Sequence, residues 1–201
     1  MKLKRHAALA AALSLTLLLG ACSSPSGSQP EDAEAVSASR PDASSQGEQA
    51  GILSAFSTTD LDGNELDQSM LEGYGLTMVN VWATYCTPCL SEMPALGELA
   101  EEYRDQGVQI VGLVSDVLNS VGSYSEEQLD TARDIVAETG ADYPHLLPSQ
   151  DLYGLLSQIY GVPTTFFVDS QGRQVGSAYV TAMEKEDWVQ VIDGVMEEAG
   201  L

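Results

Sequence analysis

The feature that most limits the fold of this chain is an apolar run that ends in two closely spaced cysteines. Residues Met78–Ala83 are apolar apart from Asn80, and Cys86-Thr-Pro-Cys89 and a helix-like segment follow. Such a run is typical of an inner strand of a parallel sheet that is covered on both faces. The pattern therefore predicts a strand that delivers a dithiol to the N-terminus of a helix.

This placement predicts the roles of the two sulfurs. Unpaired N–H groups and the positive end of the macrodipole at a helix N-terminus favour a thiolate over a thiol. In a Cys-X-X-Cys pair the pKa of a cysteine falls from about 8.5 into the range of roughly 3.5 to 7.5. We therefore predict that Cys86 attacks and that Cys89 resolves the mixed disulfide, while Pro88 restricts the backbone between them.

Two other uses of the cysteine pair remain open. A zinc site would need two further Cys or His ligands, and the remaining candidates in the chain are His6, Cys22 and His145. A purely structural disulfide would close a very short loop and would constrain little of the unfolded chain. We expect no metal, and no cofactor other than a redox-active Cys86–Cys89 disulfide.

The N-terminus has the pattern of an export signal. Basic residues in Met1–Arg5 precede an apolar run from Ala7 to Leu19, and Leu19-Gly-Ala-Cys22 follows. The run is shorter than the roughly 20 residues that a transmembrane helix needs. Small residues before a cysteine resemble the processing site of bacterial lipoproteins. We predict a signal peptide over 1–21 and a lipidated Cys22; an uncleaved anchor or an ordinary signal peptide is the alternative.

Composition divides the remainder of the chain. Residues 22–50 are rich in serine and nearly free of large hydrophobic residues, which predicts a disordered tether after the lipidated Cys22. Residues 51–201 have the mixed composition of one globular domain. Lys and Arg total 8 against 30 Asp and Glu, a formal net charge of −22. So acidic a chain is not expected to bind nucleic acid or anionic lipid headgroups.

Alternating strand and helix patterns predict an α/β domain. Ile52–Ser57 and Glu65–Leu66 flank an Asp-Gly turn and predict a hairpin. The other expected elements are a helical turn over 68–71, a helix from the cysteines to Asp105, a strand over Val108–Val114, a helix from a Ser125–Gln128 capping box to about Thr139, a helix over Asp151–Tyr160, a hairpin of Thr164–Val168 and Gln174–Tyr179, and a helix over Glu184–Ala199. His145 lies on a short strand and is interpreted as structural rather than catalytic.

Two motifs carry a resemblance to a known family. The segment Val79–Cys89 resembles the active-site segment of thioredoxin-fold proteins, and its continuation to Glu92 and Pro94 resembles the TlpA/ResA-type membrane-anchored thiol-disulfide oxidoreductases. Gly161–Asp169 is similar to the loop in which that fold carries a cis-proline facing the dithiol. The resemblance implies a thioredoxin-like α/β fold with an N-terminal β-hairpin and a central strand-helix insertion.

The resemblance also implies a set of site residues. Glu92 is expected near the cysteines, where it shares a helix face with Cys89 and could take its proton or raise its pKa; an exposed helix glutamate is the alternative. Asn80 stands where thioredoxin has a buried aspartate, which puts a copy of thioredoxin's proton chemistry in doubt. The residues expected to contact substrate are Tyr85, Pro88, Val162, Pro163 and Thr164, with a cis Val162–Pro163 bond.

The function implied is that of an extracytoplasmic, lipid-anchored oxidoreductase that reduces disulfides of partner proteins. Apocytochrome c and methionine sulfoxide reductase are the implied substrates, and a membrane protein of the CcdA/DsbD type is the implied electron donor. A peroxide-reducing redoxin is one alternative, although peroxiredoxins place a threonine three residues before the reactive cysteine and Ala83 stands there. A binding or chaperone module with an inert dithiol is the other.

Overall fold

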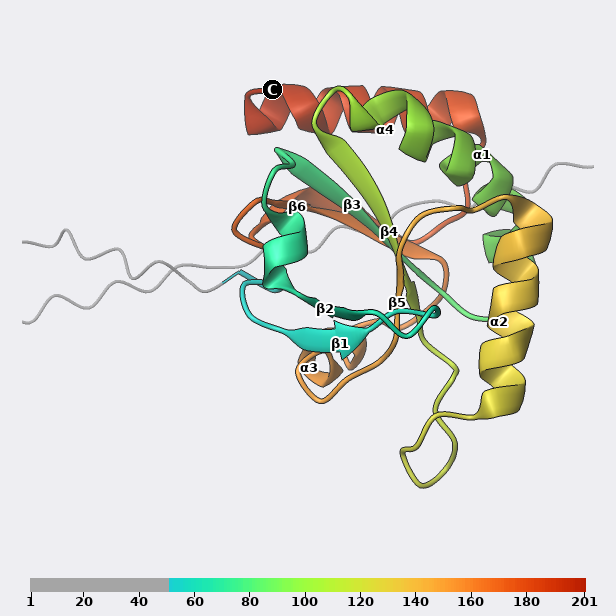
Figure 1. Cartoon of the computed structure of the whole chain (residues 1–201). Helices are drawn as coiled ribbons and strands as arrows, with labels where there is room; N and C mark the ends of the chain where they lie inside the picture. The colour runs from blue at the N-terminus through green and yellow to red at the C-terminus, as the bar shows by residue number, and fades with distance from the viewer. Residues whose placement is uncertain (1–50) are drawn as a thin grey trace, which may run out of the picture. The chain divides into compact units, whose positions relative to one another are not determined.

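A mixed five-stranded sheet runs through the residues that the computed structural model describes, 51–201 (Figure 1). Its order is β5-β4-β3-β6-β7, with β3 parallel to β4 and antiparallel to β6. The strands are β3 (Leu76–Trp82), β4 (Val108–Val114), β5 (His145–Leu146), β6 (Thr164–Asp169) and β7 (Gln174–Tyr179). The predicted hairpin of β6 and β7 is confirmed. The expectation of a parallel sheet around β3 holds on its β4 side but is wrong on its β6 side, because β6 starts at the end of the sheet where β3 finishes and runs back along it.

The central strand β3 is buried on both faces, and its side chains alternate between two cores. Met78 and Trp82 belong to a core that also contains residues of three longer helices. Val79 and Val81 belong to a second core with Leu53, Phe56, Leu71 and Leu152, which come from the segment before β3 and from the segment that precedes the short helix α3 (Tyr153–Leu156). The period of two along the strand thereby sets which side of the sheet each neighbour covers.

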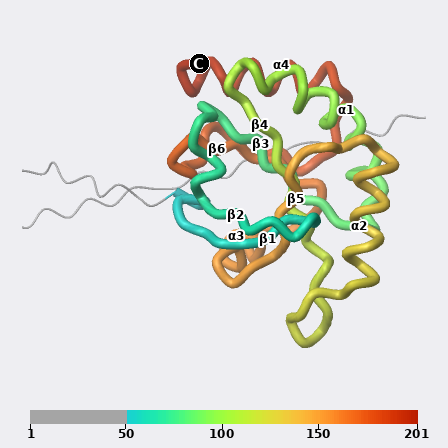
Figure 2. The backbone as a smooth tube through the Cα atoms, in the orientation of Figure 1, coloured from blue at the N-terminus to red at the C-terminus, as the bar shows by residue number. Residues whose placement is uncertain are grey.

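Three longer helices contribute residues to the first core, and Figure 2 shows the course of their backbone. They are α1 (Thr87–Arg104), α2 (Glu126–Thr139) and α4 (Lys185–Ala199). α1 begins directly after the dithiol strand, contains Pro94 in its interior and presents Leu96, Leu99 and Tyr103 to the core. α4 packs on α1 and β7. The predicted bounds of these helices agree with the structure to within a few residues.

The predicted central insertion consists of α2 and the edge strand β5, which lie between β4 and β6 in the chain. The Ser125 side chain caps α2 by accepting the Gln128 N–H at 3.4 Å. The reciprocal half of the capping box is wrong, because the Gln128 amide donates to Thr84 and Asp116 instead. The start of the insertion helix is therefore connected to the loop before the dithiol.

The N-terminal hairpin is shorter than predicted. β1 (Ser57–Thr59) pairs with β2 (Glu65–Asp67), and the one-turn helix η1 (Gln68–Leu71) follows as expected. Residues 52–56 form no strand, because Leu53 and Phe56 are buried in the second core instead of pairing in a ladder. The Asp60 carboxylate fixes the turn by accepting the N–H groups of Asp62 and Asn64.

The helix predicted over 151–160 is also shorter, since α3 comprises only Tyr153–Leu156. Beyond it, the N–H of Gln158 donates to the carbonyl of Leu155 and the N–H of Ile159 donates to the carbonyl of Leu156. These backbone hydrogen bonds have the i to i+3 spacing of tight turns. Residues 157–163 can therefore form an irregular connection to β6.

No helix within residues 51–201 is long and apolar enough to cross a membrane. The predicted signal peptide 1–21, the lipidated Cys22 and the tether over 22–50 lie outside the described residues.

Candidate active site

Cys86 and Cys89 form a disulfide at the start of α1, with their Cα atoms 5.3 Å apart. Cys86 is the N-cap residue, and its sulfur accepts the backbone N–H of Cys89 at 3.3 Å. Cys89 is fully buried, whereas Tyr85 beside Cys86 is 76% exposed. A sulfur that already accepts a helix N-terminal N–H is placed to be stabilised as a thiolate, as the sequence predicts for Cys86.

A polar anchor holds the loop that leads to the cysteines. The backbone N–H of Thr84 donates to both carboxylate oxygens of Asp116, each at 3.0 Å, and the Thr84 hydroxyl donates to one of them at 2.6 Å. Asp116 was not predicted as a site residue. The signal available in the sequence was its position just after β4, since the carboxyl ends of the parallel strands β3 and β4 meet at one edge of the sheet.

Glu92 lies one helical turn after Cys89 and is only 2% exposed, so the alternative of an exposed helix glutamate is wrong. Its Oε1 accepts the side-chain amide of Asn80 at 3.0 Å. Its Oε2 accepts the indole N–H of Trp188 and the backbone N–H of Met183, both at 3.1 Å. The same Asn80 amide also donates to the hydroxyl of Thr165 at 2.9 Å.

Burial dominates the electrostatics of this carboxyl. Desolvation raises the pKa of Glu92 above its ordinary value, and the hydrogen bonds from Met183, Asn80 and Trp188 act in the opposite direction by favouring the charged form. A raised pKa brings a carboxyl nearer to the pH range in which it can exchange a proton with a thiol. Its position at i+3 from Cys89 puts both side chains on one face of α1.

The second motif forms the turn before β6. The Val162–Pro163 bond is cis, as predicted. The hydroxyl of the buried Thr164 donates to the carbonyl of Gly161 at 2.6 Å, and this hydrogen bond stabilises the turn. Val162 and Tyr85 line one cavity of about 230 Å³, together with Ser115, Leu156, Ile159, Tyr160 and Gly161. Two of the five predicted substrate-contact residues thus border the same cavity, while the prediction that Pro163 faces Cys86 directly remains a prediction.

His145 is a buried structural residue. Its Nδ1 accepts the indole N–H of Trp82 at 3.1 Å, its Nε2 lies 3.0 Å from the carbonyl of Ala141, and its ring stacks on Tyr143. Burial lowers the pKa of His145 to about 4, so the ring is neutral near pH 7. Both nitrogens are engaged, which agrees with the structural interpretation of this histidine.

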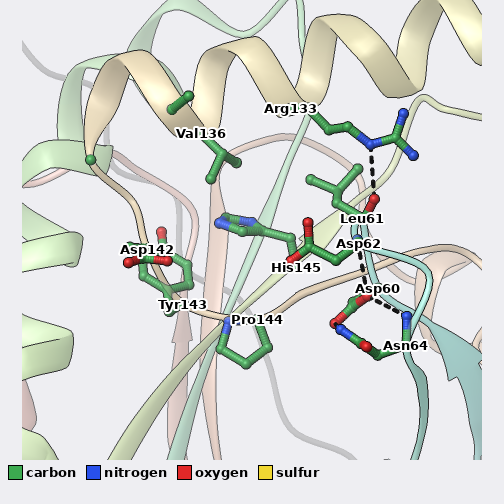
Figure 3. A pocket seen from close by; sticks show the side chains of 12 residues that line it. Asp60, Leu61, Asp62, Asn64, Arg133, Val136, Asp142, Tyr143, Pro144 and His145 are labelled. Carbon is green, nitrogen blue, oxygen red and sulfur yellow. Dashed lines mark hydrogen bonds between the residues drawn. The ribbon is translucent and has the colours of Figure 1, made fainter.

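A larger cavity, of about 710 Å³, lies between the turn after β1 and α2 (Figure 3). Its lining includes His145, Asp142 and Asp60, and Arg133 spans its rim by donating from Nε to the carbonyl of Leu61 at 2.9 Å. Neither cysteine lines it. Residues 51–201 contain no group of three or more His, Cys, Asp or Glu side chains placed to hold a metal ion.

A Cys-X-X-Cys disulfide at a helix N-terminus, with a cis-proline turn on the neighbouring strand of a mixed sheet, defines a thioredoxin-like protein. Residues 51–174 match the model of the AhpC/TSA family. The chain belongs to this family, and its relatives place it among the ResA-type thioredoxin-like proteins.

Two of these relatives are named thiol-disulfide oxidoreductase ResA. The protein from Bacillus thuringiensis (strain Al Hakam) is 33% identical over 125 residues, 60% of this chain and 63% of the relative. The protein from Geobacillus kaustophilus (strain HTA426) is 33% identical over 133 residues, 66% of this chain and 69% of the relative. The chain thus spans under two thirds of the length of the first of them.

Solved structures show the same fold. A thiol:disulfide interchange protein of the thioredoxin family from Chlorobium tepidum TLS superposes with a TM-score of 0.57 at 24% identity, covering 71% of this chain and 93% of that one. A DsbF homologue from Corynebacterium diphtheriae gives a TM-score of 0.57 at 25% identity, covering 74% and 88%.

Proposed function

We propose that this protein is a thiol-disulfide oxidoreductase that reduces disulfides of partner proteins through Cys86 and Cys89. The observation that carries the proposal is the Cys86 sulfur, which caps α1 and accepts the Cys89 N–H next to an exposed aromatic side chain. The names of the ResA relatives support the same class of activity.

The reaction follows from the two positions. In the reduced protein the Cys86 thiolate attacks a substrate disulfide, forms a bond to one substrate sulfur and releases the other as a thiolate. Cys89 then loses its proton and attacks the Cys86 sulfur, which releases the second substrate thiolate and leaves the Cys86–Cys89 disulfide. Two electrons have passed to the substrate, and a donor dithiol must return two electrons to this protein before the next cycle.

Glu92 is the proposed proton acceptor for Cys89. It is the nearest carboxyl along the α1 face that carries Cys89, and both side chains are buried. A carboxyl in that setting can take the thiol proton when Cys89 attacks, and its charge disfavours a premature Cys89 thiolate. Glu92 thereby keeps Cys89 protonated until the mixed disulfide is present.

The proposed substrate contacts lie around the cavity between Tyr85 and Val162. Tyr85 and Tyr160, which is 97% exposed, offer flat apolar surfaces at its rim. Pro88 is exposed on the first turn of α1, whereas Pro163 and Thr164 are buried and shape the turn. A partner segment in extended conformation next to Val162 would bring its disulfide to Cys86.

The proposed setting is the outer face of a cell membrane. It rests on the Leu19-Gly-Ala-Cys22 processing pattern and the tether-like composition of the residues that follow. A flexible tether over residues 23–50 would reach roughly 30 Å. Apocytochrome c or a methionine sulfoxide reductase as substrate, and a CcdA/DsbD-type membrane protein as donor, remain part of this proposal.

The test combines turnover, trapping and potential. The protein should reduce insulin disulfides with a thiol donor, and Cys86→Ser should abolish this activity. Cys89→Ser should hold a substrate protein on Cys86 as a stable mixed disulfide, which mass spectrometry identifies. A reductant should have a potential nearer thioredoxin's roughly −270 mV than the roughly −120 mV of a strong oxidant. A potential near the oxidising end would assign an oxidase instead.

A peroxide-reducing activity is the second candidate, because the matching family model is that of the AhpC/TSA family. Ala83 is fully buried at the position where peroxiredoxins place a threonine, and the hydroxyl of the adjacent Thr84 is bound to Asp116. We therefore expect peroxide consumption far slower than insulin reduction. A faster reaction with peroxide would reverse this order.

A further inference from the structure

The two oxygens of Glu92 are held from different parts of the fold. Oε1 receives the amide of Asn80 from the central strand, and Oε2 receives two N–H groups from the last segment of the chain. One is the indole N–H of Trp188, near the start of α4, and the other is the backbone N–H of Met183, just before that helix. Both residues lie beyond the 51–174 segment that matches the family model.

We propose that Trp188 is a positioning residue for the dithiol, through which the C-terminal helix sets the proton affinity of Glu92. The inference rests on the proposed role of Glu92 as the proton acceptor of Cys89. Trp188 touches no cysteine in the hydrogen-bond network and acts through the carboxylate alone.

Three features make the Trp188 contact more than core packing. The side chain is fully buried, so water cannot replace its N–H as a donor to Oε2. A hydrogen bond to a charged acceptor is stronger than one between neutral groups. The indole is also fixed in orientation, because its ring packs edge-on against Tyr179 with centroids 5.9 Å apart.

Ionisable groups around Glu92 do not offer a substitute for this donor. On its own helix the neighbouring cysteines are joined in the disulfide and do not titrate. The phenol of Tyr143, between α2 and β5, is the titratable group influenced by Glu92. Burial and then the charge on Glu92 raise the pKa of Tyr143, so this phenol remains protonated. Elsewhere between α1 and α4, Lys185 is engaged with Glu98 and Glu102, and the Tyr103 hydroxyl with Asp193.

The Glu92 carboxyl can be titrated by 13C NMR in the oxidised protein, in which Cys86 and Cys89 do not titrate. A spectrum of Glu92→Gln assigns the signal. Trp188→Phe keeps an aromatic ring but removes the donor, so the charged carboxylate loses stabilisation. We expect the pKa of Glu92 to rise by about one unit, a roughly tenfold increase in proton affinity.

Tyr103→Phe is the matched control, since it removes a hydrogen bond between the same two helices without touching Glu92. It should leave the Glu92 titration at its wild-type position. A shift of similar size in this control would mean that any loosening of α1 against α4 has the same effect, and the inference would fail.

The reduced protein supplies the functional readout. The alkylation rate of the thiols is measured as a function of pH, and the part of this profile that disappears in Glu92→Gln reports the titration of Glu92. In Trp188→Phe this part should shift to higher pH by the same amount. In a Glu92→Gln background, Trp188→Phe should have no further effect on the profile. An unmoved Glu92 titration, or an equal effect of Trp188→Phe without Glu92, refutes the positioning role. If Trp188→Phe fails to fold, the benzothienyl analogue at position 188 keeps the shape and lacks only the N–H. Absence of insulin reduction by the wild type would instead refute the proposed function and leave the titration result intact.

Discussion

Replacing Asn80 by aspartate would place a second carboxylate against Glu92 in the interior. The Asn80 amide nitrogen is 3.0 Å from Oε1 of Glu92, and both side chains are almost fully buried. In Asn80→Asp an oxygen takes the place of that donor. The pair then resembles two carboxylates that share one site, where only one can ionise readily.

The size of the effect follows from the distance. Each carboxylate charge is shared by two oxygens, so the two charges are centred farther apart than the 3.0 Å contact. Two charges about 4 Å apart repel by about 4 kcal/mol at an effective dielectric constant of about 20. The folded variant can avoid this repulsion by keeping one more proton than the unfolded chain. Its stability, relative to wild type, then falls as pH rises, by up to about 1.4 kcal/mol per pH unit for one proton. Between about pH 5 and pH 8 the added destabilisation should therefore approach, and be limited by, about 4 kcal/mol.

The assay is denaturant unfolding of the oxidised protein at several pH values, with wild type and Asn80→Asp compared at each. The same substitution in a Glu92→Gln background is the control, because the second charge is then absent and much of the pH dependence should disappear. A difference in unfolding free energy that stays constant between these pH limits, or that persists unchanged in the Glu92→Gln background, would show that the two side chains do not interact as the hydrogen bond implies.

Three further predictions concern other parts of the chain. Because the pKa of Glu92 is raised in the folded protein, Glu92 contributes stability at low pH that is lost as pH rises through this folded pKa. Glu92→Gln should remove this contribution, and the pH slope of the unfolding free energy should then differ from that of the wild type. Gly112→Ala should cost about 2 to 4 kcal/mol, because the new Cβ would overlap Nδ1 of His145 and displace the acceptor of the Trp82 indole; thermal unfolding measures it, and a variant as stable as wild type would contradict the packing. Mass spectrometry of the mature protein should find a diacylated N-terminal Cys22, and an unmodified Cys22 would exclude the lipid anchor.

The elements around the dithiol were predictable because each carries a strong local signal. The apolar run before Cys86 and the two-residue spacing within the cysteine pair each act over a few residues of sequence. Their structural outcome, a strand and a capped helix, depends little on the rest of the fold. The cis Val162–Pro163 bond was expected from the resemblance to thioredoxin-fold proteins, which connected the two motifs across the intervening residues.

The errors lie where tertiary contacts decide. Residues 52–56 have the composition of a strand, but Leu53 and Phe56 contribute to the core beneath the sheet, and their backbone joins no ladder. Gln128 has the spacing of a capping box, but Asp116 and Thr84 lie within reach of its amide only once β3 and β4 are aligned. The donors to Oε2 of Glu92 lie 91 and 96 residues further along the chain, separations that no local pattern reports.

The position of Glu92 gives a physical reason for the asparagine on the central strand. The resemblance to thioredoxin leads one to expect a buried aspartate at position 80, whereas here the buried carboxyl is supplied by α1 and the strand supplies its donor. Two buried carboxylates at this distance would repel strongly, so a charge at one position favours a neutral amide at the other. The NH₂ group of Asn80 donates hydrogen bonds to both the Glu92 carboxylate and the Thr165 hydroxyl. Asn80 thereby connects the dithiol helix α1 to β6, directly after the cis-proline turn. If Glu92 acts as proposed, the proton chemistry of the site depends on four segments at once, β3, α1, β6 and the start of α4. A change in any of them that alters a donor to Glu92 should then be detectable at the cysteines.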